Sequence, residues 1–145
     1  MLCTSTVIFG RQGPYLEMRR FGFGRSLGVE AGSRELHAWV AESFSARLLG
    51  LAGRSAIPAG RALLIPECNA VHTWGMRFAL DIAFLEWPPN AGTGVIRLCE
   101  AVGPRRWVGV RGRSALQTAV LEAPAGTLRG LGSGAVTFKA CPQGT

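Results

Sequence analysis

Residues 70–86 read AVHTWGMRFALDIAFLE, and this stretch decides the fold class. Nearly all of it is apolar or aromatic, and the main polar interruptions are His72, Thr73, Arg77 and Asp81. A run of this kind lies inside a fold. A helix of this length would normally carry a polar face and caps, whereas Gly and Pro flank the run on both sides. We therefore predict a central strand over residues 76–86, with residues 72–74 as a less regular entrance to it.

The segments around this stretch read as further short strands. Alternation in ELHAWVA (35–41) and VIRLCEAV (95–102), and the apolar run RALLIP (61–66), are typical of strands. PRRWVGVRGR and GAVTFKA add two more, and SALQTAVLEAP reads as a helical turn running into a strand. Ser43 is placed to cap one short helix. The pattern predicts a β-rich antiparallel sandwich or partly closed barrel with one or two short helices.

The length of 145 residues, 48% of them hydrophobic, suits one domain with one core. Residues 1–33 are rich in Gly and Arg and show no clear period, so we predict a variable or poorly ordered extension, in which Met18 is an alternative start. Residues 34–141 would form the domain, and residues 142–145 would fray. No apolar run reaches the roughly 18 residues that cross a bilayer, and no secretory signal is evident, which predicts a soluble cytoplasmic protein without membrane insertion.

The net charge of +7 and the pI of about 10.6 favour anionic partners. However, Lys139 is the only lysine, and Arg, Gly and Ala are all abundant, so biased coding sequence explains much of the charge. The densest basic cluster surrounds Trp107 and comprises Arg105, Arg106, Arg111 and Arg113. It could hold phosphates and stack a base. We favour the simpler interpretation of a charged strand edge that resists aggregation.

Asp81 interrupts an apolar strand, where an unpaired carboxylate would cost several kcal/mol. We expect it to pair with an arginine or with turn amides, and the alternative is a functional carboxylate in a pocket. Cys68 and His72, with Asp81 downstream, come closest to a metal-ligand set. Because the spacing is not that of a known site, we predict no metal and no cofactor. The cysteines are far apart and are expected to be free thiols.

The order of these segments resembles that of domain of unknown function family 192, a set of uncharacterised bacterial and archaeal proteins. The resemblance spans roughly residues 35–139. It is carried by an Arg before Gly-Leu, a His-Thr-aromatic-Gly-Met segment, a Leu-Asp-Ile followed by Phe, and a Leu-Glu-x-Pro-x-Gly turn. In this chain these are Arg47, Gly50 and Leu51; His72 to Met76; Leu80, Asp81 and Phe84; and Leu121, Glu122, Pro124 and Gly126. The resemblance implies a mainly β, jelly-roll-like fold and no established activity.

Three functions remain open at this point. The scarcity of acid, base and nucleophile residues favours a noncatalytic binding or interaction module. One alternative is an enzyme that uses Asp81 or His72 with an arginine on a small anionic substrate. Another is contact of the arginines with nucleic acid. The candidate functional cluster consists of Arg47, His72, Thr73, Trp74, Met76, Asp81 and Arg105.

Overall fold

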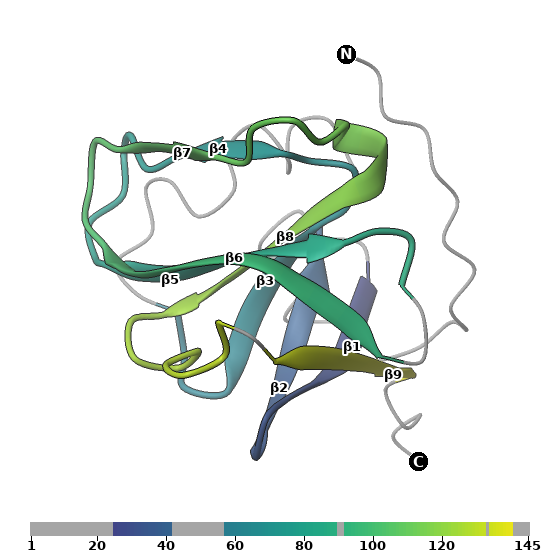
Figure 1. Ribbon diagram of the computed structural model, residues 1–145. Coiled ribbons are helices and arrows are strands. Elements are labelled where there is room, and N and C mark those ends of the chain that lie inside the picture. Colours follow the sequence, from purple (N-terminus) through teal and green to yellow (C-terminus); the bar gives the residue numbers. More distant parts are fainter. Residues whose placement is uncertain (1–24, 42–56, 90–91, 133, 141–145) are drawn as a thin grey trace.

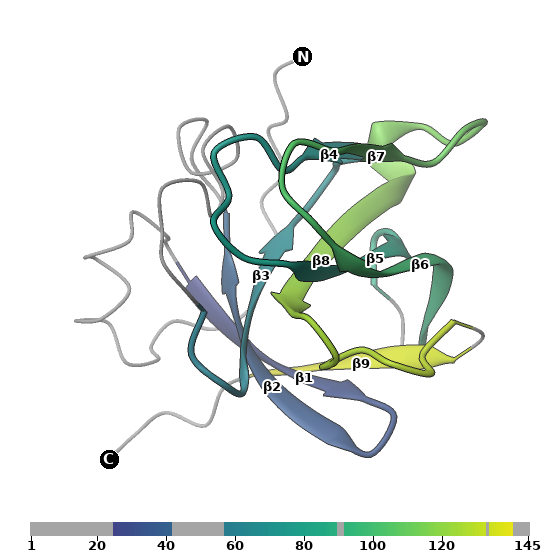
Figure 2. The same cartoon turned by 90° about the vertical axis from the view of Figure 1, so that its left-hand side faces the viewer.

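The computed structural model describes residues 25–41, 57–89, 92–132 and 134–140, and its regular structure is almost entirely β-strand (Figures 1 and 2). One short 3-10 helix, η1 (Ala115–Gln117), leads into a strand, as the SALQTAVLEAP segment predicted. The strands are β1 (Arg25–Ala31), β2 (Arg34–Val40), β3 (Arg61–Ile65), β4 (Ala70–His72), β5 (Leu80–Glu86), β6 (Thr93–Val102), β7 (Trp107–Gly109), β8 (Thr118–Pro124) and β9 (Ala135–Ala140).

Seven strands close into a barrel in the order β1-β2-β3-β8-β5-β6-β9. The ring closes where β9 pairs with β1 along its length and with β6 only at Thr93 and Gly94. Neighbouring strands are antiparallel except β2 and β3, which run parallel. A parallel pair needs a long connection, and residues 41–60 supply it. The prediction of a β-rich fold is confirmed, and of its two architectures the barrel is the one formed.

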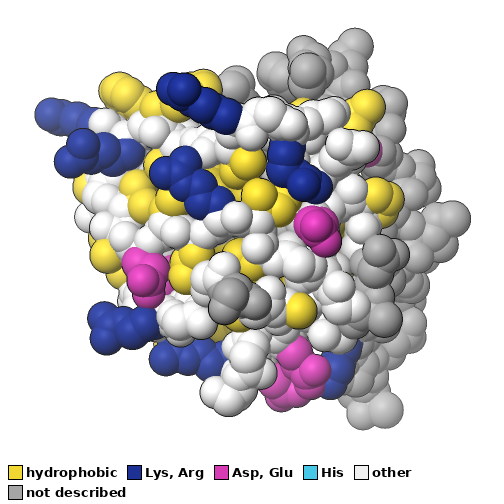
Figure 3. All heavy atoms as spheres, in the orientation of Figure 1, with side chains coloured by type: hydrophobic (Ala, Val, Ile, Leu, Met, Phe, Trp, Pro, Cys, Tyr) yellow, Lys and Arg dark blue, Asp and Glu magenta, His cyan; other side chains and the backbone are white. Residues whose placement is uncertain are grey.

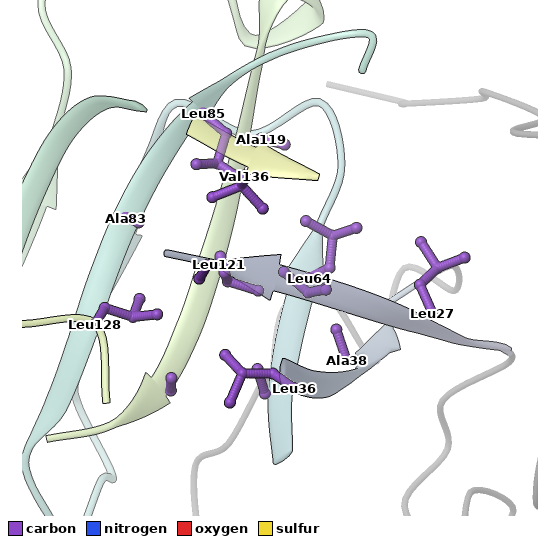
Figure 4. Packing of buried hydrophobic residues seen from close by; sticks show 14 of the residues in the cluster. Leu27, Leu36, Ala38, Leu64, Ala83, Leu85, Ala119, Leu121, Leu128 and Val136 are labelled. Atoms are coloured by element: carbon purple, nitrogen blue, oxygen red, sulfur yellow. The ribbon is translucent and has the colours of Figure 1, made fainter. Parts of the chain in front are cut away.

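Aliphatic side chains from all around the ring fill the barrel interior (Figure 4). They come from alternate positions along each strand, because successive side chains of a strand point to opposite faces. On β2, for example, Leu36, Ala38 and Val40 point inward. Leu121 of β8 and Leu85 of β5 belong to the same interior cluster.

β4 and β7 form a separate two-stranded sheet, which lies to one side of the barrel in both ribbon views (Figures 1 and 2). Val71 and Val108 of this sheet belong to a second core together with Ile82, Phe84 and other residues of the outer barrel face. β5 therefore has core on both sides, with Ala83 inside the barrel and Ile82 outside it. This is why its sequence is apolar at consecutive positions rather than at every second one.

The central strand is shorter than the sequence predicted. β5 begins at Leu80, so residues 76–79 of the predicted strand lie in a loop that continues the turn at residues 73–75. The N–H of Met76 donates to the C=O of Thr73, and Gly75 has a φ of 80°, a left-handed conformation that glycine adopts without steric cost. The local turn therefore overrides the strand propensity of the apolar residues that follow it.

The domain also starts earlier than residue 34. β1 lies within the predicted extension, yet it pairs with both β2 and β9 and buries Leu27, Val29 and Ala31 in the barrel. These residues alternate in the manner of a strand, and the surrounding glycines and arginines masked the pattern. The short helix expected from Ser43 falls outside the described residues. Within the residues that the structure describes, no helix is long and apolar enough to cross a membrane.

Candidate functional site

The outward face of the β4–β7 sheet carries aromatic rings in the open. His72 and Trp107 are cross-strand partners, and their rings stack at a centroid distance of 6.2 Å and an interplanar angle of 17°. Trp74 meets the other side of the cluster edge-on, 6.1 Å from the His72 ring. Trp107 is 68% exposed and Trp74 is 52% exposed. Large aromatic side chains are seldom left this open, so the cluster is a candidate contact surface.

Thr73 connects the end of β4 to the loop before β7 by hydrogen bonds. Its buried hydroxyl donates to the C=O of Gly103 at 2.7 Å and accepts from the N–H of Arg106 at 2.8 Å. Its backbone binds the same loop, since Thr73 N–H donates to Arg106 and Thr73 C=O accepts from Arg105. Arg105 is exposed and has a φ of 59°. Hydrogen bonds from Thr73 therefore position the backbone of Arg105 and Arg106, directly before Trp107.

A groove of about 670 Å³ lies beside this aromatic cluster, where β7 passes over β6. Its lining comprises Asn69, Ala70, Ile96, Arg97, Trp107, Gly109, Val110 and Arg111. Figure 3 shows Lys and Arg side chains gathered over this upper part of the molecule, with apolar side chains exposed between them. Its volume falls in the range of ordinary ligand sites, roughly 300–1,000 Å³. The lining combines positive charge, one large ring and apolar surface, and none of these described residues is acidic.

Small residues create the hollow. Ala70 and Gly109 are opposite each other on β4 and β7, on the same face as Trp107. A Cβ atom at Gly109 would lie 3.2 Å from the C=O oxygen of Asn69 and 3.3 Å from the Cβ of Ala70. Contacts this short force neighbouring atoms to shift, so a larger residue fits poorly at this position. Because Gly109 has no side chain, the groove is deeper beside the Trp107 ring.

Arg97 ties the groove to the barrel. It lies opposite Phe84 on the outer face of the barrel sheet, next to a register shift between Phe84 and Leu85. Its Nη1 donates to the C=O of Gly109 at 2.6 Å. Charge-assisted bonds of this kind are stronger than neutral ones. The barrel therefore supplies one wall of the groove, and the small sheet supplies the other.

Asp81 is fully buried and satisfied by the backbone. One carboxylate oxygen accepts from the N–H of Ala101 and the other from the N–H of Leu128, both at 2.9 Å. The sequence led us to expect an arginine or turn amides as partners; the described residues supply one turn amide, from Leu128, and one amide of strand β6, from Ala101. The carboxylate anchors β6 and the turn after β8 to the start of β5. It does not face the groove, whereas His72 is exposed, so the geometry does not present the two side chains to one substrate.

Glu122 is another buried carboxyl group; with Asp81 and Glu67 it makes three among the described residues. It lies on β8 between Leu63 and Ile82 of the neighbouring strands, on the outer barrel face beneath the second core. Burial among apolar side chains raises the pKa of Glu122 to about 7. The charged form is disfavoured because it loses hydration without gaining a cationic neighbour among the described residues. This group titrates near neutral pH but does not line the groove.

The structure brings only part of the predicted cluster together. His72, Thr73, Trp74 and Arg105 gather at the β4–β7 sheet, Met76 is buried in the second core, and Asp81 is sealed elsewhere. Arg47 lies outside the described residues. Sequence reasoning missed Arg97, Asn69 and Gly109. An arginine inside the apolar run VIRLC was a usable signal for Arg97, but nothing local marks the other two.

The described residues contain neither a metal-binding cluster nor a disulfide. Within residues 25–41, 57–89, 92–132 and 134–140, no group of three or more His, Cys, Asp or Glu side chains is placed to hold a metal ion. Cys68 and Cys99 are not linked in a disulfide, and the Sγ of Cys68 donates to the C=O of Ala70.

Comparison with known families agrees with the segment order noted in the sequence. The model of DUF192, described as an uncharacterised family (Uncharacterized ACR), matches residues 27–136. The chain belongs to the DUF192 family. The match begins within β1, at Leu27. No curated protein matches the sequence.

Two crystal structures share the fold. A protein of unknown function from Novosphingobium aromaticivorans has a TM-score of 0.62 at 17% identity, and the match covers 79% of this chain and 83% of that one. A Sinorhizobium meliloti protein, described as a candidate transcription regulator, has a TM-score of 0.63 at 18% identity, with 81% and 95% covered. At these identities the likeness shows a common fold and nothing about activity.

Proposed function

We propose that this DUF192 protein is a noncatalytic binding module that takes an anionic ligand in the groove between β6 and β7. The observation that carries the proposal is the pairing of two arginines with an exposed ring. Arg97 and Arg111 line the groove beside Trp107. Guanidinium groups recognise carboxylates, phosphates and sulfonates, and a large ring supplies contact area at low entropic cost.

The chemistry of the groove favours binding over catalysis. Its described lining has no carboxyl group, thiol, hydroxyl or imidazole that could act as acid, base or nucleophile. The buried carboxylate of Asp81 is occupied by two backbone amides, so it is not available to a substrate. A ligand held by Arg97, Arg111 and Trp107 would be retained rather than transformed.

A fluorescent anion tests this proposal. We expect 8-anilinonaphthalene-1-sulfonate to bind more tightly than 1-anilinonaphthalene, which has the same rings without the sulfonate. Arg111→Gln should weaken binding of the sulfonate about tenfold and leave the neutral compound unaffected, since it removes one charge-assisted contact. Arg129→Gln is the matched control, because Arg129 is exposed but does not line the groove. Equal losses in the two variants, or none in either, would contradict the proposal.

Single-stranded nucleic acid is the second candidate ligand. The exposed rings of Trp107, His72 and Trp74 form a platform on which bases could stack, and Arg105 and Arg106 stand exposed beside it. Binding of oligothymidine should then weaken steeply with salt and weaken further in the double variant Arg105→Ala with Arg106→Ala. The absence of any complex at low salt would rule out this ligand.

A further inference from the structure

We infer that the ligand is an acidic peptide segment in extended conformation, which adds as a third strand to the free edge of β7. This inference rests on the proposed function, because it names the class of anion that the groove takes. It draws on the backbone groups of β7 that point away from β4.

The hydrogen bonds between β4 and β7 show which backbone groups face outward. Val110 N–H donates to Asn69, and Thr73 N–H donates to Arg106. In an antiparallel pair, residues that bond their partner alternate with residues whose N–H and C=O point away from it. Val108 lies midway between the two bonded positions and therefore bonds Val71. Trp107 and Gly109 lie at the alternate positions, so their backbone groups point to the open edge.

Among the described residues, this edge of β7 has one hydrogen-bond partner. The C=O of Gly109 accepts from Arg97, which reaches it from β6. For the N–H of Gly109 and for both backbone groups of Trp107, no residue in the described part of the chain provides a hydrogen-bond partner. An exposed row of such groups is a template for an added strand, and peptide-binding domains use it in this way. All three groups lie on residues that line the groove.

The positive charge of the groove determines which kind of peptide strand can add to β7. Side chains of an incoming strand alternate between two faces, and the groove offers an arginine toward each of them. Arg111 lies in the turn just after β7 and lines the groove there, while Arg97 lines it from the barrel side. Carboxylates at successive positions would therefore each meet a guanidinium. A second copy of this chain, with a net charge of +7, would be repelled. An acidic peptide is the occupant that fits both the edge and the charge.

The direct test measures peptide binding and amide exchange together. A fluorescein-labelled peptide in which pairs of adjacent Glu residues are separated by Val should raise its anisotropy on binding, because adjacent carboxylates point to opposite faces of the added strand. A peptide of the same pattern with Lys in place of Glu should not. Hydrogen exchange by NMR then reports the mode of binding. The Trp107 and Gly109 amides should exchange quickly in the free protein and about tenfold more slowly in the complex. The Val108 amide, already bonded to β4, should change little and serves as the internal control.

A pair of variants separates the backbone from the ring. Trp107→Ala and Trp107→Pro both remove the indole, but only the proline also removes the outward N–H. Loss of one interfacial hydrogen bond should weaken peptide binding by about a further fivefold in Trp107→Pro. Because that variant also risks misfolding, the amide exchange of the wild-type protein gives an independent answer.

The outcomes separate this inference from the proposed function. Slowed exchange at Trp107 and Gly109 with the acidic peptide supports strand addition. Peptide binding that leaves both amides unprotected overturns it. If the anilinonaphthalene sulfonate or oligothymidine binds and the acidic peptide does not, the groove still binds anions, and only the strand addition fails. If none of these probes binds, both proposals fail.

Discussion

The two sheets of this molecule differ in how many strand edges they leave unpaired and in how many large side chains they expose. In the seven-stranded barrel, strands pair around a closed ring, and aliphatic side chains fill the interior. The β4–β7 sheet has two strands of three residues each, a free edge, and aromatic rings on its outer face. Closure removes the edges that attract other strands. This difference indicates that the buried cores, which come mainly from the barrel strands, stabilise the molecule. The features suited to binding lie on the exposed face and edge of the small sheet.

The largest expected effect lies in the barrel wall. Phe84 is completely buried in β5, so Phe84→Ala should lower the free energy of unfolding by about 4 kcal/mol through lost burial and a residual cavity. Urea denaturation measures the change. A loss below about 1 kcal/mol would show that β5 is not the centre of stability.

The next effect depends on pH and concerns Glu122. Its pKa is 4.5 when unfolded and about 7 when folded, so the folded protein holds this proton more tightly. Stability from this group is therefore complete below pH 4.5 and is lost as pH rises toward 7. The loss amounts to about 3 kcal/mol for a shift of this size. Glu122→Gln removes the titration, so the variant should gain stability relative to wild type across this window.

The measurement is the difference in unfolding free energy between the Glu122→Gln variant and wild type at several pH values. Glu100→Gln is the matched control, because it makes the same substitution at an exposed position. A constant difference for Glu122→Gln would mean that water or a cation reaches this carboxyl group.

A smaller effect should follow from Thr73, at the border between the two sheets. Thr73→Val removes two hydrogen bonds and leaves the Arg106 N–H without its hydroxyl acceptor. We expect a loss of about 2 kcal/mol and faster amide exchange at Arg106. Thr73→Ser keeps the hydroxyl and should restore the slow exchange at Arg106. If valine and serine behave alike, the hydroxyl does not hold the loop.

The smallest effect on stability is expected at the binding surface itself. Trp107 is 68% exposed, so Trp107→Ala should change the free energy of unfolding by less than about 0.5 kcal/mol. The same variant should lose ligand. A stability loss comparable with that of Phe84→Ala would show that the two sheets fold as one unit of packing and would remove the contrast between them.

The sequence determined the fold class, because strand-length apolar runs, alternation and turn residues are local signals that survive without tertiary context. It also determined that a carboxylate at position 81 needs partners. The family followed from motif order, which is again a property of the chain alone.

Tertiary structure decided the rest. The alternation of β1 was masked by the glycines and arginines around it, and its pairing with β2 and β9 shows that it is a strand of the barrel. The amides of Ala101 and Leu128 reach Asp81 from 20 and 47 residues away. The groove joins residues far apart in the chain, since Arg97, next to a register shift between β5 and β6, donates to Gly109 of the small sheet. Register and long-range pairing depend on the sum of many contacts, and no local pattern encodes that sum.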